Sequence, residues 1–268
     1  SWPPKTETAA TGTLSPFRRE HSIFEKTPAA PYAVRTGIPN VVRKAAGREA
    51  VRVAYFGGGI HHVSGWRGKL RTWLETEMPE TTFTYVDGSI CDCVRGSSFS
   101  AYRFDHDILD HSPDLVLVDF ASADATADPM AIQRTMEGIV RKTWSRNPQI
   151  DIVFLYAFRA GYEVSYAKNV CPTAVSAYET VSKYYGVPSI NMGYAVGQAI
   201  SNGTMVPTGD GAAKPAFSTA GVRPTAAADA LYTGALKEGF AALLKAEIQT
   251  QHRILEPLDE DHFQGAKL

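Results

Sequence analysis

The chain has few cysteines, no long apolar run and almost no net charge, and each absence excludes a class of protein. Its 268 residues include only three cysteines, too few for the disulfide framework of a small secreted domain. The net charge of −1 argues against a nucleic-acid-binding protein held by phosphate contacts. No apolar stretch reaches the roughly 18 residues that a membrane-spanning helix needs. We therefore expect neither a nucleic acid nor a membrane as a partner.

Common nucleotide-binding motifs are also missing. Three glycines stand together at positions 57–59, but the more distant glycine of a dinucleotide fingerprint does not follow them, and no Gly-Lys-Ser/Thr phosphate loop is present. No signal peptide is visible at Ser1, as in a mature secreted protein or a trimmed chain. Secreted and cytoplasmic locations therefore both stay open, as does the oligomeric state.

The hydrophobic pattern predicts an α/β protein. Residues 51–60 read VRVAYFGGGI, an apolar run typical of a buried parallel strand, followed by glycines that allow a tight turn. Further strands are expected at 81–86, 114–120, 151–158 and 188–192. Helices are expected at 38–46, 66–78, 102–109, 132–144, 173–185 and 225–245. This alternation predicts a three-layer α/β/α sandwich around a five-stranded parallel sheet.

We expect one domain with an extension at each end. Residues 1–35 are rich in proline, threonine and charge and predict an extended N-terminal arm. Residues 36–247 contain the α/β domain. Residues 248–268 are polar and predict a C-terminal tail.

Four short blocks resemble the SGNH (GDSL-type) hydrolase family. They read YFGGGI, SIC at 89–91, VDFASAD and AGVRP, in the family's order and spacing, within about residues 38–243. The resemblance implies a flavodoxin-like SGNH fold and descent from enzymes that cleave esters, often acyl or acetyl groups on sugars. It thus implies a small-molecule or carbohydrate ligand. In the family a serine attacks, a histidine is its base, an aspartate orients the histidine, and a glycine amide and an asparagine stabilise the oxyanion.

All five signature residues are replaced at the matching positions. The serine, glycine and asparagine positions hold Gly59, Cys91 and Ala123, and the aspartate and histidine positions hold Ala220 and Arg223. Glycine has no side chain to attack with, and arginine stays protonated near neutral pH. We therefore expect no ordinary serine-esterase activity. The crevice is then either repurposed, by a metal or a thiol, or kept for binding or scaffolding in an inactive protein.

Reactive side chains follow the ends of several predicted strands. The metal-binding candidates share the residue types that hold zinc and similar divalent ions: His61, His62, Cys91, Asp92 and Cys93. The catalytic candidates for a thiol mechanism are Cys91 as nucleophile, His61 as base and Asp124.

The candidate substrate-binding residues are Gly58, Gly59, Ala123, Arg95 and Arg223. The two arginines suit an anion such as a carboxylate or a phosphate. Because the carboxyl ends of parallel strands meet at one edge, we expect the candidates to surround one crevice. Plainer interpretations stay open: His61 and His62 form a solvated turn, and the cysteines fill loops or form a disulfide.

Overall fold

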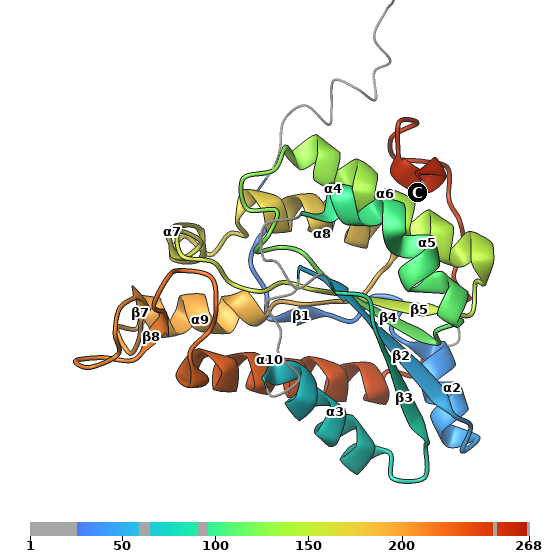
Figure 1. Ribbon diagram of the computed structural model, residues 1–268, viewed down its shortest axis with the longest axis horizontal. Helices are drawn as coiled ribbons and strands as arrows, with labels where there is room; N and C mark the ends of the chain where they lie inside the picture. The colour runs from blue at the N-terminus through green and yellow to red at the C-terminus, as the bar shows by residue number, and fades with distance from the viewer. Residues whose placement is uncertain (1–25, 59–64, 90–95, 249–250, 267–268) are drawn as a thin grey trace, which may run out of the picture.

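The structure, a computed structural model, describes residues 26–58, 65–89, 96–248 and 251–266. It confirms the three-layer α/β/α architecture, with a central sheet between two layers of helices (Figure 1). Five strands run parallel: β2 (Val51–Gly57), β3 (Phe83–Asp87), β4 (Leu115–Asp119), β5 (Asp151–Leu155) and β6 (Ser189–Ile190). All five lie at the positions that the apolar runs predict.

Within the described ranges the sheet has six strands rather than the five expected. The order is β1-β6-β5-β4-β2-β3, and β1 (Tyr32–Ala33) pairs antiparallel with β6 at one edge. This added strand comes from the segment predicted as an extended arm. Pairing with β6 satisfies backbone groups that an uncovered sheet edge would leave to water.

Helices cover both faces of the sheet. On one face lie α4 (Ser97–Ser100), α5 (Phe104–Asp107), α6 (Pro129–Arg146) and α8 (Thr173–Tyr185); on the other lie α3 (Trp66–Glu77) and α10 (Ala226–Lys245) (Figure 1). The other helical elements are α2 (Pro39–Ala46), α7 (Glu163–Tyr166), α9 (Met192–Ser201), η1 (Ala101–Arg103), η2 (Leu109–His111) and η3 (Phe263–Gly265). Among the residues described, no helix is both long and apolar enough to cross a membrane.

Local sequence accounts for where these elements begin. The side chain of Asp128 caps α6, with Pro129 at its first turn, and Thr225 caps α10. The strands β4 and β5 are buried along their whole length, as a central parallel sheet requires.

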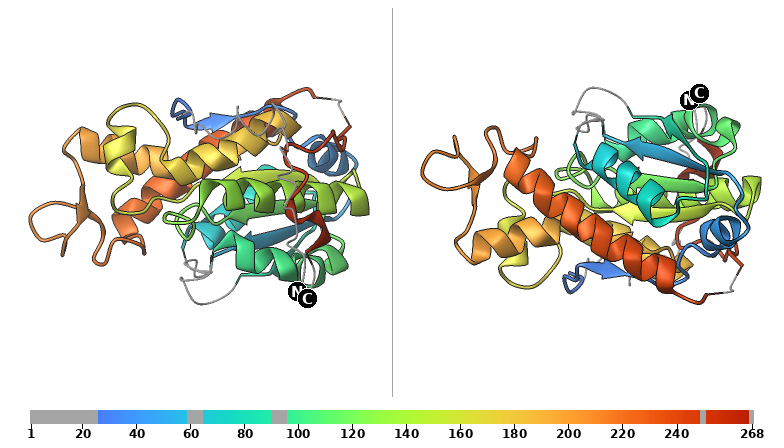
Figure 2. Two further views of the ribbon diagram at one scale, coloured as in Figure 1. Left: turned by 90° about the horizontal axis from the view of Figure 1, so that it is seen from above. Right: turned by 90° about the horizontal axis from the view of Figure 1, so that it is seen from below.

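The segment at 201–219, where the sequence analysis predicts neither a strand nor a helix, contains a small parallel sheet of β7 (Val206–Thr208) and β8 (Ala216–Ser218). Together with α7 and α9 it projects beyond one end of the main sheet (Figure 2). These elements follow the carboxyl ends of β5 and β6 in the chain. They therefore lie next to the carboxyl edge of the sheet, where sheets of this type bind ligands.

Residues 251–266 pack against α6. Glu137 on α6 accepts the backbone N–H groups of Leu258 and Asp259, and η3 crosses α6 at Gly138. A Cβ atom at Gly138 would lie 2.5 Å from the carbonyl carbon of Phe263, so only glycine allows this close approach.

Candidate functional site

The turn after β2 lies directly against the turn after β4. The Gly58 N–H donates to the Asp119 carbonyl at 3.0 Å, and a Cβ atom at Gly58 would lie 3.1 Å from Cβ of Ala123. At Gly57 a Cβ atom would lie 2.6 Å from the Asp119 carbonyl oxygen, so a side chain there would clash with the backbone. The glycines thus bring two predicted substrate-binding residues, Gly58 and Ala123, side by side.

Asp124 follows Ala123 and is 1% exposed. Its Oδ1 accepts the backbone N–H of Ser97 at 2.8 Å, and its Oδ2 accepts the Tyr178 hydroxyl at 2.6 Å. Burial raises the pKa of Asp124 above the usual range of an aspartate. With both oxygens engaged, this carboxyl group joins the turn after β4 to α4 and α8. Its catalytic role stays a prediction.

The turn before α10 is organised around the Ser218 hydroxyl. Its oxygen accepts the N–H groups of Ala220, Gly221 and Val222, at 3.3, 3.0 and 3.2 Å. Gly221 has a φ of +85°, a conformation that favours glycine, and its carbonyl accepts the N–H of Ala160 at 2.9 Å. This turn is therefore held beside the segment after β5, with Ala220 and the predicted substrate-binding residue Arg223 exposed on it.

A buried arginine, not identified from the sequence, lies beneath the glycine turn. The guanidinium of Arg67 pairs with Asp87 at 3.1 Å and lies 4.9 Å from the centre of the Tyr55 ring. Burial lowers the pKa of Arg67. Burial opposes ionisation of Asp87 too, but hydrogen bonds from Ser89 and the charge of Arg67 outweigh it and lower the pKa of Asp87. The pair ties α3 to the carboxyl end of β3.

Arg159 is a second cation at this edge that the sequence analysis did not select. It follows β5, and its Nη1 donates to the Ser122 carbonyl at 3.0 Å. It therefore fastens the end of β5 to the turn that carries Ala123. A lone arginine after a strand has no distinctive spacing, so only the fold identifies this contact.

The remaining predicted site residues lie outside the described residues: Gly59, His61, His62, Cys91, Asp92, Cys93 and Arg95. Among the residues that the structure describes, no group of three or more His, Cys, Asp or Glu side chains is placed to hold a metal ion. The metal and thiol hypotheses depend on the undescribed positions and stay predictions.

Solved structures with similar folds include several esterases. A two-domain esterase (CEX) active on acetylated mannans has a TM-score of 0.71 at 17% identity, covering 90% of this chain and 62% of that one. An acetyl-xylooligosaccharide esterase, Axe2 from Geobacillus Stearmophilus, has a TM-score of 0.56 at 14% identity, covering 74% and 95%. A lipase/acylhydrolase from Enterococcus faecalis has a TM-score of 0.51 at 11% identity, covering 72% and 96%.

These similarities show that the chain has the fold of the SGNH, or GDSL-type, hydrolases. At such low identity they show the fold alone. The chain spans about 62% of the length of the two-domain esterase. No protein-family model matches the sequence, and no curated protein matches it at a significant level.

Proposed function

We propose that this protein recognises an acylated carbohydrate in the crevice at the carboxyl edge of its sheet and does not cleave it with a Ser-His-Asp triad. The observation that carries the proposal is the contact between Gly58 and Ala123. Where the SGNH resemblance places an asparagine that stabilises the oxyanion, this chain presents a methyl group. That methyl group lies against a glycine.

The chemistry of this contact suits binding better than acyl transfer. An oxyanion hole needs N–H donors aimed at the developing charge, but the Gly58 N–H is already bonded to the Asp119 carbonyl at 3.0 Å. Gly58 is buried, and the partly exposed methyl group of Ala123 beside it offers a small apolar contact. This contact suits the methyl end of an acetyl group, because removing that methyl group from water lowers the free energy.

The carbohydrate part of the proposal is supported by the fold. One similar structure is an esterase active on acetylated mannans, also solved after co-crystallisation with mannopentaose. Another is an acetyl-xylooligosaccharide esterase. We extend their class of ligand, but not their catalytic residues, to this chain.

A hydrolase with a rebuilt site is the second candidate. It is favoured by the residue types at 61–62 and 91–93, because His, Cys and Asp support thiol or metal chemistry. In the thiol version His61 takes the proton of Cys91 as the sulfur attacks the ester carbonyl, the C–O bond breaks and the alcohol leaves with that proton, and water then hydrolyses the thioester. In the metal version two or more of His61, His62, Cys91, Asp92 and Cys93 hold a divalent ion such as zinc.

Binding and turnover should be measured on the same preparation. Affinity gel electrophoresis with acetylated mannan and with the same mannan after chemical deacetylation tests recognition. We expect retardation by the acetylated polymer only. Ala123→Asp, which places a charge on the apolar contact, should abolish retardation. The matched control Ala127→Asp, at an exposed position of the same turn, should leave it unchanged.

Hydrolysis of 4-nitrophenyl acetate distinguishes the two candidates. We expect no turnover above that of a control protein. Turnover that a thiol reagent or a chelator abolishes would establish the rebuilt hydrolase, whereas turnover abolished by a serine-directed phosphonate would refute the absence of a catalytic serine. Equal retardation by both mannans, or by neither, would refute acyl recognition.

A further inference from the structure

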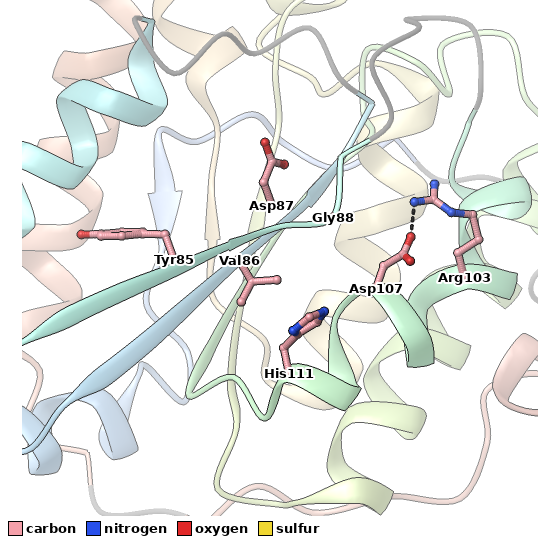
Figure 3. Close-up of a pocket in the computed structure, with 7 residues that line it drawn as sticks. All are labelled: Tyr85, Val86, Asp87, Gly88, Arg103, Asp107 and His111. Carbon is pink, nitrogen blue, oxygen red and sulfur yellow. Dashed lines mark hydrogen bonds and ion pairs between the residues drawn. The ribbon is translucent and has the colours of Figure 1, made fainter.

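Two arginines near the carboxyl edge of the sheet are neutralised by carboxylates. Arg67 pairs with Asp87, and Figure 3 shows the ion pair that Arg103 forms with Asp107. Asp87, Arg103 and Asp107 line a depression of about 390 Å³ beside β3. Because each of these arginines is paired with an opposite charge, neither pair selects a charged ligand.

Arg159, in the segment after β5, differs from both. Its Nη1 donates to the Ser122 carbonyl at 3.0 Å, but among the described residues no carboxylate lies within ion-pair distance of its guanidinium. The side chain is partly exposed, and an arginine stays protonated near neutral pH. The protein thus fixes one nitrogen of this guanidinium and leaves its positive charge without an opposite charge.

Two acidic residues that are close to this contact in the sequence are engaged elsewhere. Glu163 accepts the N–H of Gly161 at 2.7 Å. Both oxygens of the buried Asp124 accept hydrogen bonds, and burial raises the pKa of this carboxyl group, which opposes its ionisation. Neither side chain forms an ion pair with Arg159, so the charge of the guanidinium is available to a ligand.

Arg159 lies between two of the turns that form the candidate crevice. Its bond to Ser122 places the guanidinium beside the residue that precedes Ala123, on the turn after β4. The N–H of the next residue, Ala160, donates to the Gly221 carbonyl of the turn before α10 at 2.9 Å. A ligand whose acyl methyl group contacts the partly exposed Ala123 can therefore reach Arg159 within the span of one sugar unit.

The free side of the Arg159 guanidinium suits a carboxylate. Among the described residues, the Nε and Nη2 atoms have no hydrogen-bond partner, whereas Nη1 is bonded to Ser122. Parallel N–H donors in the plane of a guanidinium match the two oxygens of a carboxylate, which they bind through two hydrogen bonds. A neutral hydroxyl group offers no charge to balance the guanidinium.

We infer that Arg159 is a specificity-determining residue that binds a carboxylate group of the carbohydrate, so that the preferred ligand is an acylated acidic carbohydrate built from uronate units. The inference rests on the proposed function. It adds the charge of the ligand: the Ala123 contact recognises the acyl group, and Arg159 recognises a carboxylate near it.

The test compares two acetylated oligosaccharides that differ in charge. Isothermal titration calorimetry uses an acetylated galacturonate oligomer and the acetylated galactose oligomer with a hydroxymethyl group in place of each carboxylate. Wild-type protein should bind the acidic oligomer about tenfold to a hundredfold more tightly, the range expected for a hydrogen bond between charged groups. Arg159→Gln should remove this preference and leave binding of the neutral oligomer unchanged.

Two further variants complete the design. Arg159→Lys keeps the charge but loses the parallel donors, so it should retain only part of the preference. Arg253→Gln, which removes an exposed arginine of the C-terminal segment, is the matched control and should bind both oligomers as wild type does. Dextran sulfate should displace the acidic oligomer less effectively than polygalacturonate does.

The outcomes separate the inference from the function on which it rests. Equal binding of the two oligomers by wild type, equal weakening of both by Arg159→Gln, or equal displacement by dextran sulfate would refute the carboxylate contact. The proposed function would still stand if deacetylation of either oligomer abolished its binding. If deacetylation changed neither affinity, acyl recognition would be refuted, even where Arg159→Gln removed a preference for the acidic chain.

Discussion

Removing the hydroxyl group of Tyr178 should destabilise the protein far more than its size suggests. Tyr178 is 0% exposed, and its hydroxyl donates to Asp124 Oδ2 at 2.6 Å. In Tyr178→Phe that carboxylate oxygen stays buried without its donor. A hydrogen bond to a charged group contributes about 1.5–3 kcal/mol, and we expect the free energy of unfolding to fall by about this amount.

A double-mutant cycle tests whether the loss belongs to this one contact. Asp124→Ala should cost about 2–5 kcal/mol, because it leaves the Ser97 N–H and the Tyr178 hydroxyl unsatisfied. The double variant Asp124→Ala, Tyr178→Phe should be little worse than Asp124→Ala alone. The sum of the two single effects should therefore exceed the effect of the double variant by about 1.5–3 kcal/mol.

The measurement is urea denaturation followed by tyrosine and tryptophan fluorescence. Tyr184→Phe, on the same helix, is the control: its hydroxyl donates to the Glu256 carbonyl at 2.7 Å from a partly exposed ring, and its loss should cost less than about 0.5 kcal/mol. Additive single effects, or equal losses for Tyr178→Phe and Tyr184→Phe, would show that Asp124 does not hold α8 to the turn after β4.

Three further predictions concern Asp124 and two other buried groups. Burial raises the pKa of Asp124, so the native state binds this proton more tightly than the unfolded state does. The free energy of unfolding of wild type, relative to Asp124→Asn, should therefore fall as pH rises above about 4, the pKa of an aspartate in the unfolded state. A relative free energy of unfolding that rises over this pH range in urea titrations would contradict the burial argument. His252→Ala should lower the free energy of unfolding by about 2–4 kcal/mol, because it removes a stacked ring and a buried hydrogen bond to Asp151 at 2.7 Å. The control His106→Ala, at an exposed position, should change the free energy of unfolding by less than about 0.5 kcal/mol. Equal losses for the two variants in thermal or urea unfolding would refute the role of His252. Burial raises the pKa of the Cys171 thiol to about 12, so peptide mapping after iodoacetamide treatment at pH 8 should find Cys171 alkylated only in denatured protein, and alkylation at the rate of an exposed thiol would contradict its burial.

The sheet was predictable because its central strands are buried on both faces. Apolar runs such as those of β4 and β5 have the length and composition of a buried strand and of no other element. The two-residue strand β1 was not predictable, since its pairing with β6 depends on where the arm meets the sheet edge. The helix α9 was missed because it begins directly after β6, and its sequence is rich in glycine.

At the candidate site, the sequence predicted where the turns lie, but not which side chains hold them in place. The adjacency of Gly58 and Ala123 follows from two strands that end at the same edge. The partner of Asp124 on α8 is 54 positions away, and Arg67 is one of several cations on its helix. Neither has a spacing that distinguishes it from a solvated residue, so their roles appear only once the fold brings them together.

Besides the Asp124 side chain, backbone groups hold the turns at the carboxyl edge of the sheet together. Backbone bonds from Gly58 to Asp119 and from Ala160 to Gly221 hold neighbouring turns together, and Ser218 organises the last turn through three backbone N–H groups. A nucleophile or base on these turns would therefore add reactivity without adding support. The proposed binding function is consistent with this arrangement, because these turns are held in place without a contribution from a nucleophile or a base.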